Sequence, residues 1–386
     1  MVKILTAYTA EIDEAEGALA EILEQIDLNG LRKNSVGIVS CHSEFIATGI
    51  LRELSEKLPF DVIGATTMSC ATAAGYGMYS LSLTVLTSDD VTFETAVSAP
   101  LYMSDYEKTM TDAYDAARQK LAGEPSLVIS FFPLSADLSG AVLLERLNTL
   151  CGGAPIFGGL SSDVLLTQEN CFTFKNGDGD KRAAAFLLMH GEVKPQFIVS
   201  SLPDRNVSKQ KATVTEAEGC VLKKVNGVPL MEYLKERGVL TRADSGISAV
   251  NVPLVVDYGN GSRPVALRVY NVFENGDALI GGAIPVGATI SIGQIDHDGI
   301  MGTSREALER ISAVSGDDGV LIFTCVSRFL MLSPDREEEI REITATVGDK
   351  TPYSVAYVAG ELCPIYGEDG KTYNKMHNYS CVACVF

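Results

Sequence analysis

The chain has 386 residues, of which 46% are hydrophobic and 21% charged, and its formal net charge is −19. This composition is that of a folded protein long enough for two domains, and it argues against disorder. Because so anionic a surface repels phosphate groups and no run of Lys or Arg offsets it, nucleic acids and anionic membranes are disfavoured as partners.

The N-terminal segment lacks the apolar core and the small-residue cleavage site of a signal peptide. No apolar stretch approaches the ~20 residues that a membrane-spanning helix needs. We therefore expect a cytoplasmic protein without membrane insertion, whose nine scattered cysteines are reduced thiols.

In the first region, short apolar runs typical of buried strands alternate with segments whose apolar residues recur every three or four positions, as on one face of a helix. Residues 46–58 and the segment after a capping box at Ser104 and Glu107 are two such helices. The expected strands are Val2–Tyr8, Val36–Cys41, Asp61–Thr66, Ser80–Thr87, Val91–Val97 and Ser126–Phe132. This alternation indicates a mixed α/β (α+β) fold of layered sheets flanked by helices.

Between Ala154 and Thr215 short strands dominate, and turn signals such as Asn176-Gly177 separate them. The polar segment Pro203–Lys211 is the best candidate for a joint between domains. We therefore expect two domains, residues 1–210 and residues 211–386.

The second region mixes strands with two well-marked helices. Thr303 and Glu306 form a capping box before the first of them. A Ser-Pro pair followed by acidic residues marks the start of the second, whose apolar face consists of Ile340, Ile343 and Val347.

The chain carries none of the common catalytic or nucleotide-binding motifs. It has no Gly-x-x-x-x-Gly-Lys-Ser/Thr loop, no Gly-x-Gly-x-x-Gly after the first strand, no Gly-x-Ser-x-Gly elbow and no His-Glu-x-x-His. Its four histidines lie too far apart in sequence for a His-rich metal site. We therefore expect no metal, no cofactor and no enzymatic activity.

Several segments, in order along nearly the whole chain, resemble the FIST family, which pairs an N domain with a C domain. Ile63–Tyr79 and Pro155–Gly191 are similar to glycine-rich segments of the N domain, and Lys211–Gly238 resembles the join between the two domains. The segments similar to the C domain are Asn275–Ile292, Phe323–Arg328 and Ala359–Asn378. The resemblance implies a stand-alone bacterial sensor-type protein that binds a small molecule, an amino acid or similar metabolite, and signals to a partner protein.

Arg328 and Glu361 are the first candidates for binding such a ligand. Arg328 follows a buried strand and precedes a helix start, where anions often bind, and its planar guanidinium can hold a carboxylate with two hydrogen bonds. Glu361, at another strand end, could hold an ammonium group, so that the two residues would suit a zwitterion. The alternative is that Arg328 and Glu361 pair with each other and lock two strands together.

The remaining candidates are small residues at strand ends and in loops. Some of them can line a pocket but can equally cap a turn, pack in the core or serve as loop residues. These candidates are Thr66, Thr67, Ser69, Cys70, Cys325 and Asn378.

Two other functions stay open. A haem-binding sensor of a gas such as NO needs an axial ligand in an apolar pocket, and His377 is the histidine that we assign to that role. A thiol-dependent enzyme would use Cys70 or Cys325 as its nucleophile.

Overall fold

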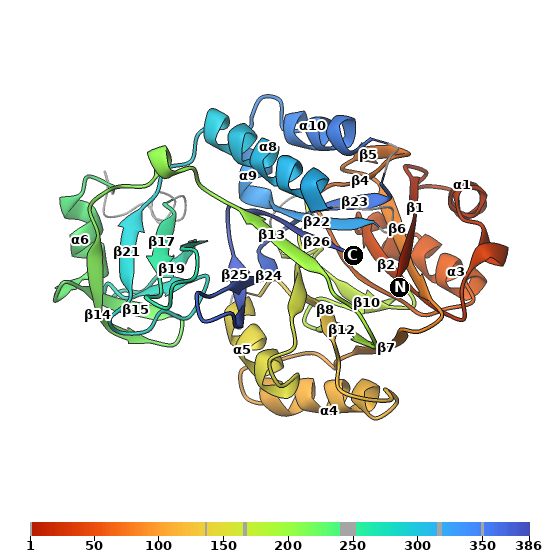
Figure 1. The fold of residues 1–386 in the computed structure, drawn as a ribbon, viewed down its shortest axis with the longest axis horizontal. Helices are drawn as coiled ribbons and strands as arrows, with labels where there is room; N and C mark the ends of the chain where they lie inside the picture. Colours follow the sequence, from red (N-terminus) through yellow and green to blue (C-terminus); the bar gives the residue numbers. More distant parts are fainter. Residues whose placement is uncertain (1, 136, 165–167, 240–251, 315–318, 349–350) are drawn as a thin grey trace.

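The computed structural model describes the whole chain except residues 1, 136, 165–167, 240–251, 315–318 and 349–350. It contains a large body of three six-stranded sheets with helices outside them, and a smaller lobe built on an eight-stranded sheet (Figure 1). This architecture confirms the predicted mixed α/β fold of layered sheets flanked by helices.

The three sheets of the body contain six strands each, and their strands come from distant parts of the chain. In spatial order, the first sheet consists of β1 (Lys3–Thr9), β6 (Leu81–Ser88), β2 (Asn34–Cys41), β3 (Val62–Thr66), β10 (Thr173–Lys175) and β11 (Asp178–Asp180). The second consists of β25 (Thr372–His377), β24 (Glu361–Tyr366), β9 (Ile156–Leu160), β8 (Leu127–Phe132), β12 (Ala185–His190) and β7 (Thr92–Val97). The third consists of β13 (Gln196–Ser200), β26 (Cys381–Val385), β22 (Val320–Cys325), β23 (Tyr353–Val358), β4 (Cys70–Thr72) and β5 (Gly75–Gly77).

All three sheets are built on the same plan. Each contains one parallel pair, β2 with β3, β8 with β9 or β22 with β23, and its other neighbours are antiparallel. The two strands beyond the parallel pair form a hairpin that another third of the chain supplies: β10–β11 for the first sheet, β24–β25 for the second and β4–β5 for the third. The three sheets thus share one strand order, and each of them is completed by a hairpin from another third of the chain.

The inner faces of the three sheets meet in one apolar core. At its centre, the Phe323 ring lies 5.2 Å from that of Phe157 and 5.8 Å from that of Phe131, which connects the third sheet to the second. The first sheet contributes Ile4, Ile38 and other residues to the same cluster. Burial of these side chains is the main force that holds the body together.

Helices cover the outer face of each sheet, as their apolar spacing predicts. Three groups of helices lie on the right, at the bottom and at the top of Figure 1, over the first, second and third sheets. They are α1 (Ala15–Gln25) with α2 (Glu44–Ala47) and α3 (Ile50–Lys57), α4 (Tyr106–Arg118) with α5 (Gly140–Leu150), and α8 (His297–Val314) with α9 (Val326–Met331) and α10 (Glu338–Val347). A short 3-10 helix, η1 (Leu28–Gly30), follows α1.

The lobe is an insertion between β13 and α8, on the left of Figure 1. Its apolar residues form a cluster that also includes Ile365 of β24 in the body. In spatial order its strands are β18 (Val265–Leu267), β17 (Leu254–Asp257), β21 (Thr289–Ile292), β14 (Ala212–Glu218), β15 (Val221–Val225), β20 (Ala278–Ile280) and β19 (Val269–Val272), with β16 (Val228–Pro229) beside β15. The described part of the lobe also contains the 3-10 helix η2 (Asp204–Asn206) and the helix α6 (Leu230–Glu236).

The expected boundary between residues 210 and 211 falls between β13 and β14. Strands from the two sides of this point share sheets, since β13 pairs with β26, β9 with β24 and β4 with β23. The body is therefore built from both halves of the chain.

Candidate functional site

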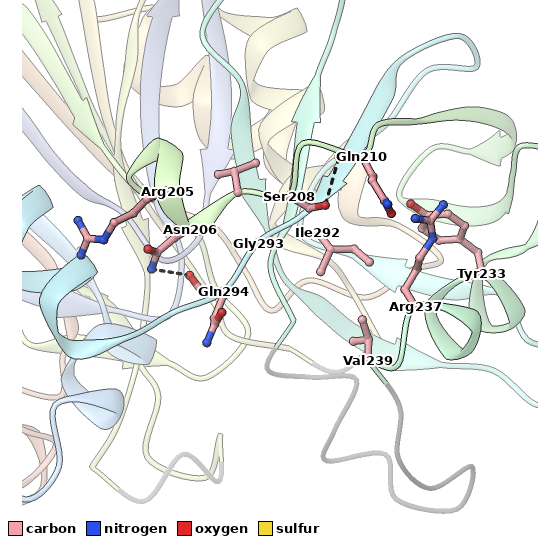
Figure 2. Close-up of a pocket in the computed structure, with 11 residues that line it drawn as sticks. Arg205, Asn206, Ser208, Gln210, Tyr233, Arg237, Val239, Ile292, Gly293 and Gln294 are labelled. Atoms are coloured by element: carbon pink, nitrogen blue, oxygen red, sulfur yellow. Dashed lines mark hydrogen bonds between the residues drawn. The ribbon is translucent and has the colours of Figure 1, made fainter.

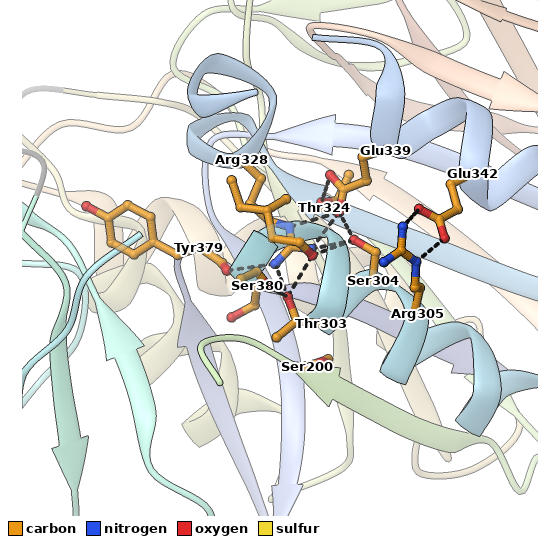
Figure 3. Close-up of polar contacts among 12 residues, drawn as sticks. Ser200, Thr303, Ser304, Arg305, Thr324, Arg328, Glu339, Glu342, Tyr379 and Ser380 are labelled. Atoms are coloured by element: carbon orange, nitrogen blue, oxygen red, sulfur yellow. Dashed lines mark hydrogen bonds and ion pairs between the residues drawn. The ribbon is translucent and has the colours of Figure 1, made fainter. Parts of the chain in front are cut away.

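Arg328 is fully enclosed, with 1% of its surface exposed. Its Nη2 lies 2.6 Å from Oε1 of Glu339 on α10, and its Nε donates to the same oxygen at 2.9 Å (Figure 3). The other acceptors of its guanidinium are Thr303 Oγ1, Ser304 Oγ, and the carbonyl oxygens of Ile300 and Tyr379. A ligand carboxylate would have to displace these protein acceptors. The alternative interpretation, in which Arg328 pairs with Glu361, differs from the structure, because the partner of Arg328 is Glu339.

Glu339 completes this buried network. Thr324, Tyr357 and Ser304 all donate hydrogen bonds to its carboxylate. Burial alone would raise the pKa of Glu339, but the attraction of Arg328 and the hydrogen bonds outweigh it and lower that pKa. The network therefore ties α8, α9 and α10 to the third sheet.

Glu361, the first residue of β24, is also completely buried. Its Oε2 accepts a hydrogen bond from the Ser380 backbone N–H at 3.4 Å, while its Oε1 has no partner in the described part of the chain. Burial raises its pKa well above the usual value, although a hydrogen bond from Cys325 works in the opposite direction. The structure thus places Cys325 beside the Glu361 carboxyl group, and burial there favours the neutral form of that group.

Asn378 and His377 make specific contacts within the protein. The Asn378 Oδ1 accepts from the Arg268 backbone N–H at 3.0 Å, and its Nδ2 donates to the Tyr270 hydroxyl at 3.1 Å, so this side chain connects the body to the lobe. His377 is 1% exposed, its Nε2 lies 2.9 Å from the Cys363 carbonyl oxygen, and burial lowers its pKa to about 4. One of the two imidazole nitrogens, Nε2, is thus engaged by the backbone and is not open to a haem iron.

The candidates Thr66, Thr67, Ser69 and Cys70 lie together where β3 ends and β4 begins. The Thr66 hydroxyl accepts from a backbone N–H, and the Cys70 Sγ lies 3.1 Å from Ser80 Oγ. The hydroxyl groups of Thr67 and Ser69 are buried and have no hydrogen-bond partner among the described residues. Of this group, these two retain free hydrogen-bonding capacity.

A cavity of about 540 Å³ lies at the junction of the body and the lobe, and it is lined by residues that the sequence did not single out as ligand contacts. Arg263 of the lobe and Glu306 of α8 face each other there, with 3.8 Å between Nη1 and Oε1. Ser201, directly after β13, lines the same cavity with a buried hydroxyl that has no hydrogen-bond partner among the residues that the structure describes. The apolar part of the wall includes Val199 and Ile365.

One feature of the sequence pointed to this site: residues of the polar segment Pro203–Lys211, which we predicted as the joint between domains, line the cavity. It gave no signal for the meeting of Arg263 with Glu306, which are far apart in the chain and are brought together by the insertion of the lobe.

A second cavity, of about 350 Å³, lies between η2, β21 and α6 (Figure 2). Its two arginines point to different ends: Arg237 stacks on Tyr233 with 5.0 Å between guanidinium and ring, while Arg205 lies 3.8 Å from Asp296. Since these charges do not converge, this cavity is less suited to one charged ligand.

Within the described residues, no group of three or more His, Cys, Asp and Glu side chains is arranged to hold a metal ion. No helix in the same part of the chain is long and apolar enough to cross a membrane.

Two domains of one known protein family match most of the chain. The FIST N domain matches residues 35–228 and the FIST C domain matches residues 230–364. The chain belongs to the FIST family. This confirms the resemblance seen in the sequence, and FIST domains are small-ligand-binding sensory domains. No curated protein matches this FIST chain significantly.

Among solved structures, the FIST chain is similar to two cyanuric acid hydrolases. One, described as an evolutionary innovation by structural concatenation, has 8% identity and a TM-score of 0.35; the other, from A. caulinodans, has 11% identity and a TM-score of 0.37. Each comparison covers 100% of this chain and 98% of the other. Since these proteins are enzymes, we correct the expectation that the chain has no enzymatic activity, and that expectation is withdrawn. Similarity at this level gives no argument for a particular reaction.

Proposed function

We propose that this FIST protein is a sensory protein whose ligand, an amino acid or similar small metabolite, binds in the cavity between the body and the lobe. The observation that carries the proposal is that Arg263 and Glu306 lie 3.8 Å apart in that cavity. The hydroxyl of Ser201, which has no partner in the described part of the chain, lines the same cavity.

The two charges match the two ends of an amino acid. Arg263 can grip a carboxylate with two parallel hydrogen bonds, and Glu306 can accept from an ammonium group. Arg263 and Glu306 are 68% and 49% exposed, and a loose exposed ion pair of this kind contributes little stability. A zwitterion can therefore replace their mutual contact at small cost.

The surroundings of Glu306 hold it in place for this role. Ser200 donates to its Oε2 at 3.2 Å, and the Arg310 Nη1 lies 3.7 Å from its Oε1 while donating to the Val199 carbonyl oxygen at 2.8 Å. Arg310 and Ser200 thus position the carboxylate, and the apolar wall beside it offers room for a small side chain.

The location also suits a sensor. The apolar cluster of the lobe includes Ile365 of the body, which lines this cavity, so a ligand bound there changes the balance of contacts that sets the relative position of lobe and body. We expect the signal to pass to a partner protein that binds one arrangement of lobe and body more tightly than the other.

The test is a screen in which the amino acids and other small metabolites are added to wild type and to variants. Binding is measured by thermal shift and by calorimetry. Arg263→Gln and Glu306→Gln should each weaken binding by about tenfold or more, the usual effect of removing a hydrogen bond to a charged group. Arg305→Gln is the matched control, because Arg305 neighbours Glu306 on α8 but pairs with Glu342. A ligand that binds wild type and Arg263→Gln equally would exclude this site.

The residues chosen from the sequence define a competing location. Glu361→Gln and Thr67→Val, measured in the same screen, test it: loss of binding in these variants with full binding in Arg263→Gln would place the ligand at the strand ends of the body instead.

A further inference from the structure

Lys375, on β25, faces another cavity at the junction of the body and the lobe. This cavity has a volume of about 450 Å³. Besides Lys375 its walls include Tyr258, Ile284 and Val286 of the lobe, and Glu145 of α5. None of Arg263, Glu306 and Ser201 lines it.

The ammonium group of Lys375 is half-buried and lacks a counter-ion. Its Nζ lies 3.9 Å from the centre of the Tyr258 ring, and no carboxylate of the described residues comes within ion-pairing distance of it. Burial lowers the pKa of Lys375, and the attraction of Glu145 acts in the opposite direction without cancelling this shift. By contrast Lys371, on the same hairpin, has Asp369 at 3.4 Å.

A partly desolvated charge without an opposite charge is costly, and proteins generally pair such groups. The Tyr258 ring supplies part of the missing stabilisation through its electron-rich face. The space next to it remains open, and its apolar rim includes Val286, which is 62% exposed although it is a large aliphatic residue.

We propose that this cavity is a binding site for a small monocarboxylate with an apolar body, such as an aromatic or branched aliphatic acid. The carboxylate provides the counter-charge for Lys375, and the apolar body covers Ile284 and Val286. Glu145 on the same wall repels a second negative charge, which favours a monoanion over a dianion.

This site is independent of the zwitterion site. It offers one unpaired positive charge, whereas Arg263 and Glu306 offer one charge of each sign. A carboxylate without an ammonium group therefore distinguishes the two sites, and either can fail without the other.

Isothermal titration calorimetry with phenylacetate, isovalerate and the uncharged phenylacetamide tests the proposal on the full chain. We expect both acids to bind wild type and the amide not to bind detectably. Lys375→Met, which keeps the length of the apolar stem, should weaken the acids about tenfold or more, whereas Lys375→Arg should retain most of the affinity. Affinity should also fall as the pH rises through the titration of Lys375.

Lys371→Met is the matched control, and it should bind both acids as wild type does. Urea unfolding of each variant verifies that it is folded, and Lys375→Arg keeps the test valid if Lys375→Met does not fold. The proposal is overturned if neither acid binds wild type at millimolar concentration, or if the amide binds as well as the acids. It is also overturned if Lys375→Met binds the acids as tightly as wild type does, or if Lys371→Met loses as much affinity as Lys375→Met.

Discussion

Arg328 and Glu339 form an ion pair that is closed to solvent on both sides, with exposed fractions of 1% and 0%. They are 11 positions apart in the chain, and they join the helix after β22 to the first turn of α10. Further hydrogen bonds connect Arg328 to Thr303 and Ser304 of α8, and Glu339 to Thr324 and Tyr357 of the third sheet. The pair therefore has a structural role in holding the helices on this sheet.

Removing one member of this pair should be strongly destabilising. Arg328→Ala leaves the Glu339 carboxylate buried without its counter-ion, so we expect the free energy of unfolding to fall by ~3–5 kcal/mol. Urea denaturation followed by circular dichroism measures this. Arg305→Ala, which breaks the exposed pair with Glu342, should leave the midpoint nearly unchanged. The paired replacement Arg328→Met with Glu339→Leu should cost less than the sum of the single changes, and additive losses would show that the two residues are not coupled.

Two buried glutamates should respond to pH in opposite directions. The pKa of Glu361 is raised in the folded state, so its contribution to stability is present below the unfolded pKa of ~4.3 and is lost as pH rises. The pKa of Glu339 is lowered, so its contribution is present above ~4.3 and is lost as pH falls through the folded value.

Relative to wild type, Glu361→Gln should therefore become more favourable as the pH rises above about 4.5, whereas Glu339→Gln should stay constant above about pH 4.5 and become more favourable as the pH falls below ~4.3. Melting temperatures of wild type and both variants, recorded from about pH 3 to about pH 8, measure the two trends. The same slope for both substitutions would contradict the assigned environments.

Local patterns in the sequence predicted the elements well, but not their partners. The apolar face assigned to Ile340 and Ile343 is buried, as expected for α10. The acidic residues before it suggested only a favourable first turn, yet one of them, Glu339, is the buried partner of Arg328. Periodicity reports which face of a helix is apolar, whereas the pairing of two charges depends on how distant elements pack.

The capping box expected at Thr303 and Glu306 illustrates the same limit. In the structure α8 begins at His297, so both residues lie inside the helix. Thr303 donates to the carbonyl oxygens of Gly299 and Ile300, and Glu306 is free to face the cavity opposite Arg263. The threefold plan of the body was equally hidden, because it is carried by strand order and hairpin exchange and not by repeated residues.

The cysteines should be inert in the native protein. All nine are buried, and burial raises the pKa of each thiol, so that the reactive thiolate is scarce near pH 7. We expect slow labelling by iodoacetamide in buffer and labelling of all nine after unfolding in guanidinium, as measured by intact-protein mass spectrometry. Rapid native labelling of Cys70 or Cys325 would instead support the thiol-dependent enzyme.

Gly158 should tolerate no side chain. It lies on β9 with φ of 150°, and a Cβ atom there would be 1.9 Å from the Ser130 carbonyl oxygen of the parallel neighbour β8. Its other neighbour is Leu362 of β24, so a shift of β9 would also disturb the hairpin that the last third of the chain donates to this sheet.

We expect Gly158→Ala to lower the free energy of unfolding by about 3 kcal/mol or more, because backbone strain and overpacking each cost about 1–3 kcal/mol. Gly302→Ala is the control: Gly302 lies within α8 with open space around its Cα, so alanine should be neutral or stabilising by up to about 1 kcal/mol. Urea unfolding curves compare the two. Equal stability of both variants would mean that β8 and β9 can separate freely, which the exchanged hairpins of the three sheets should prevent.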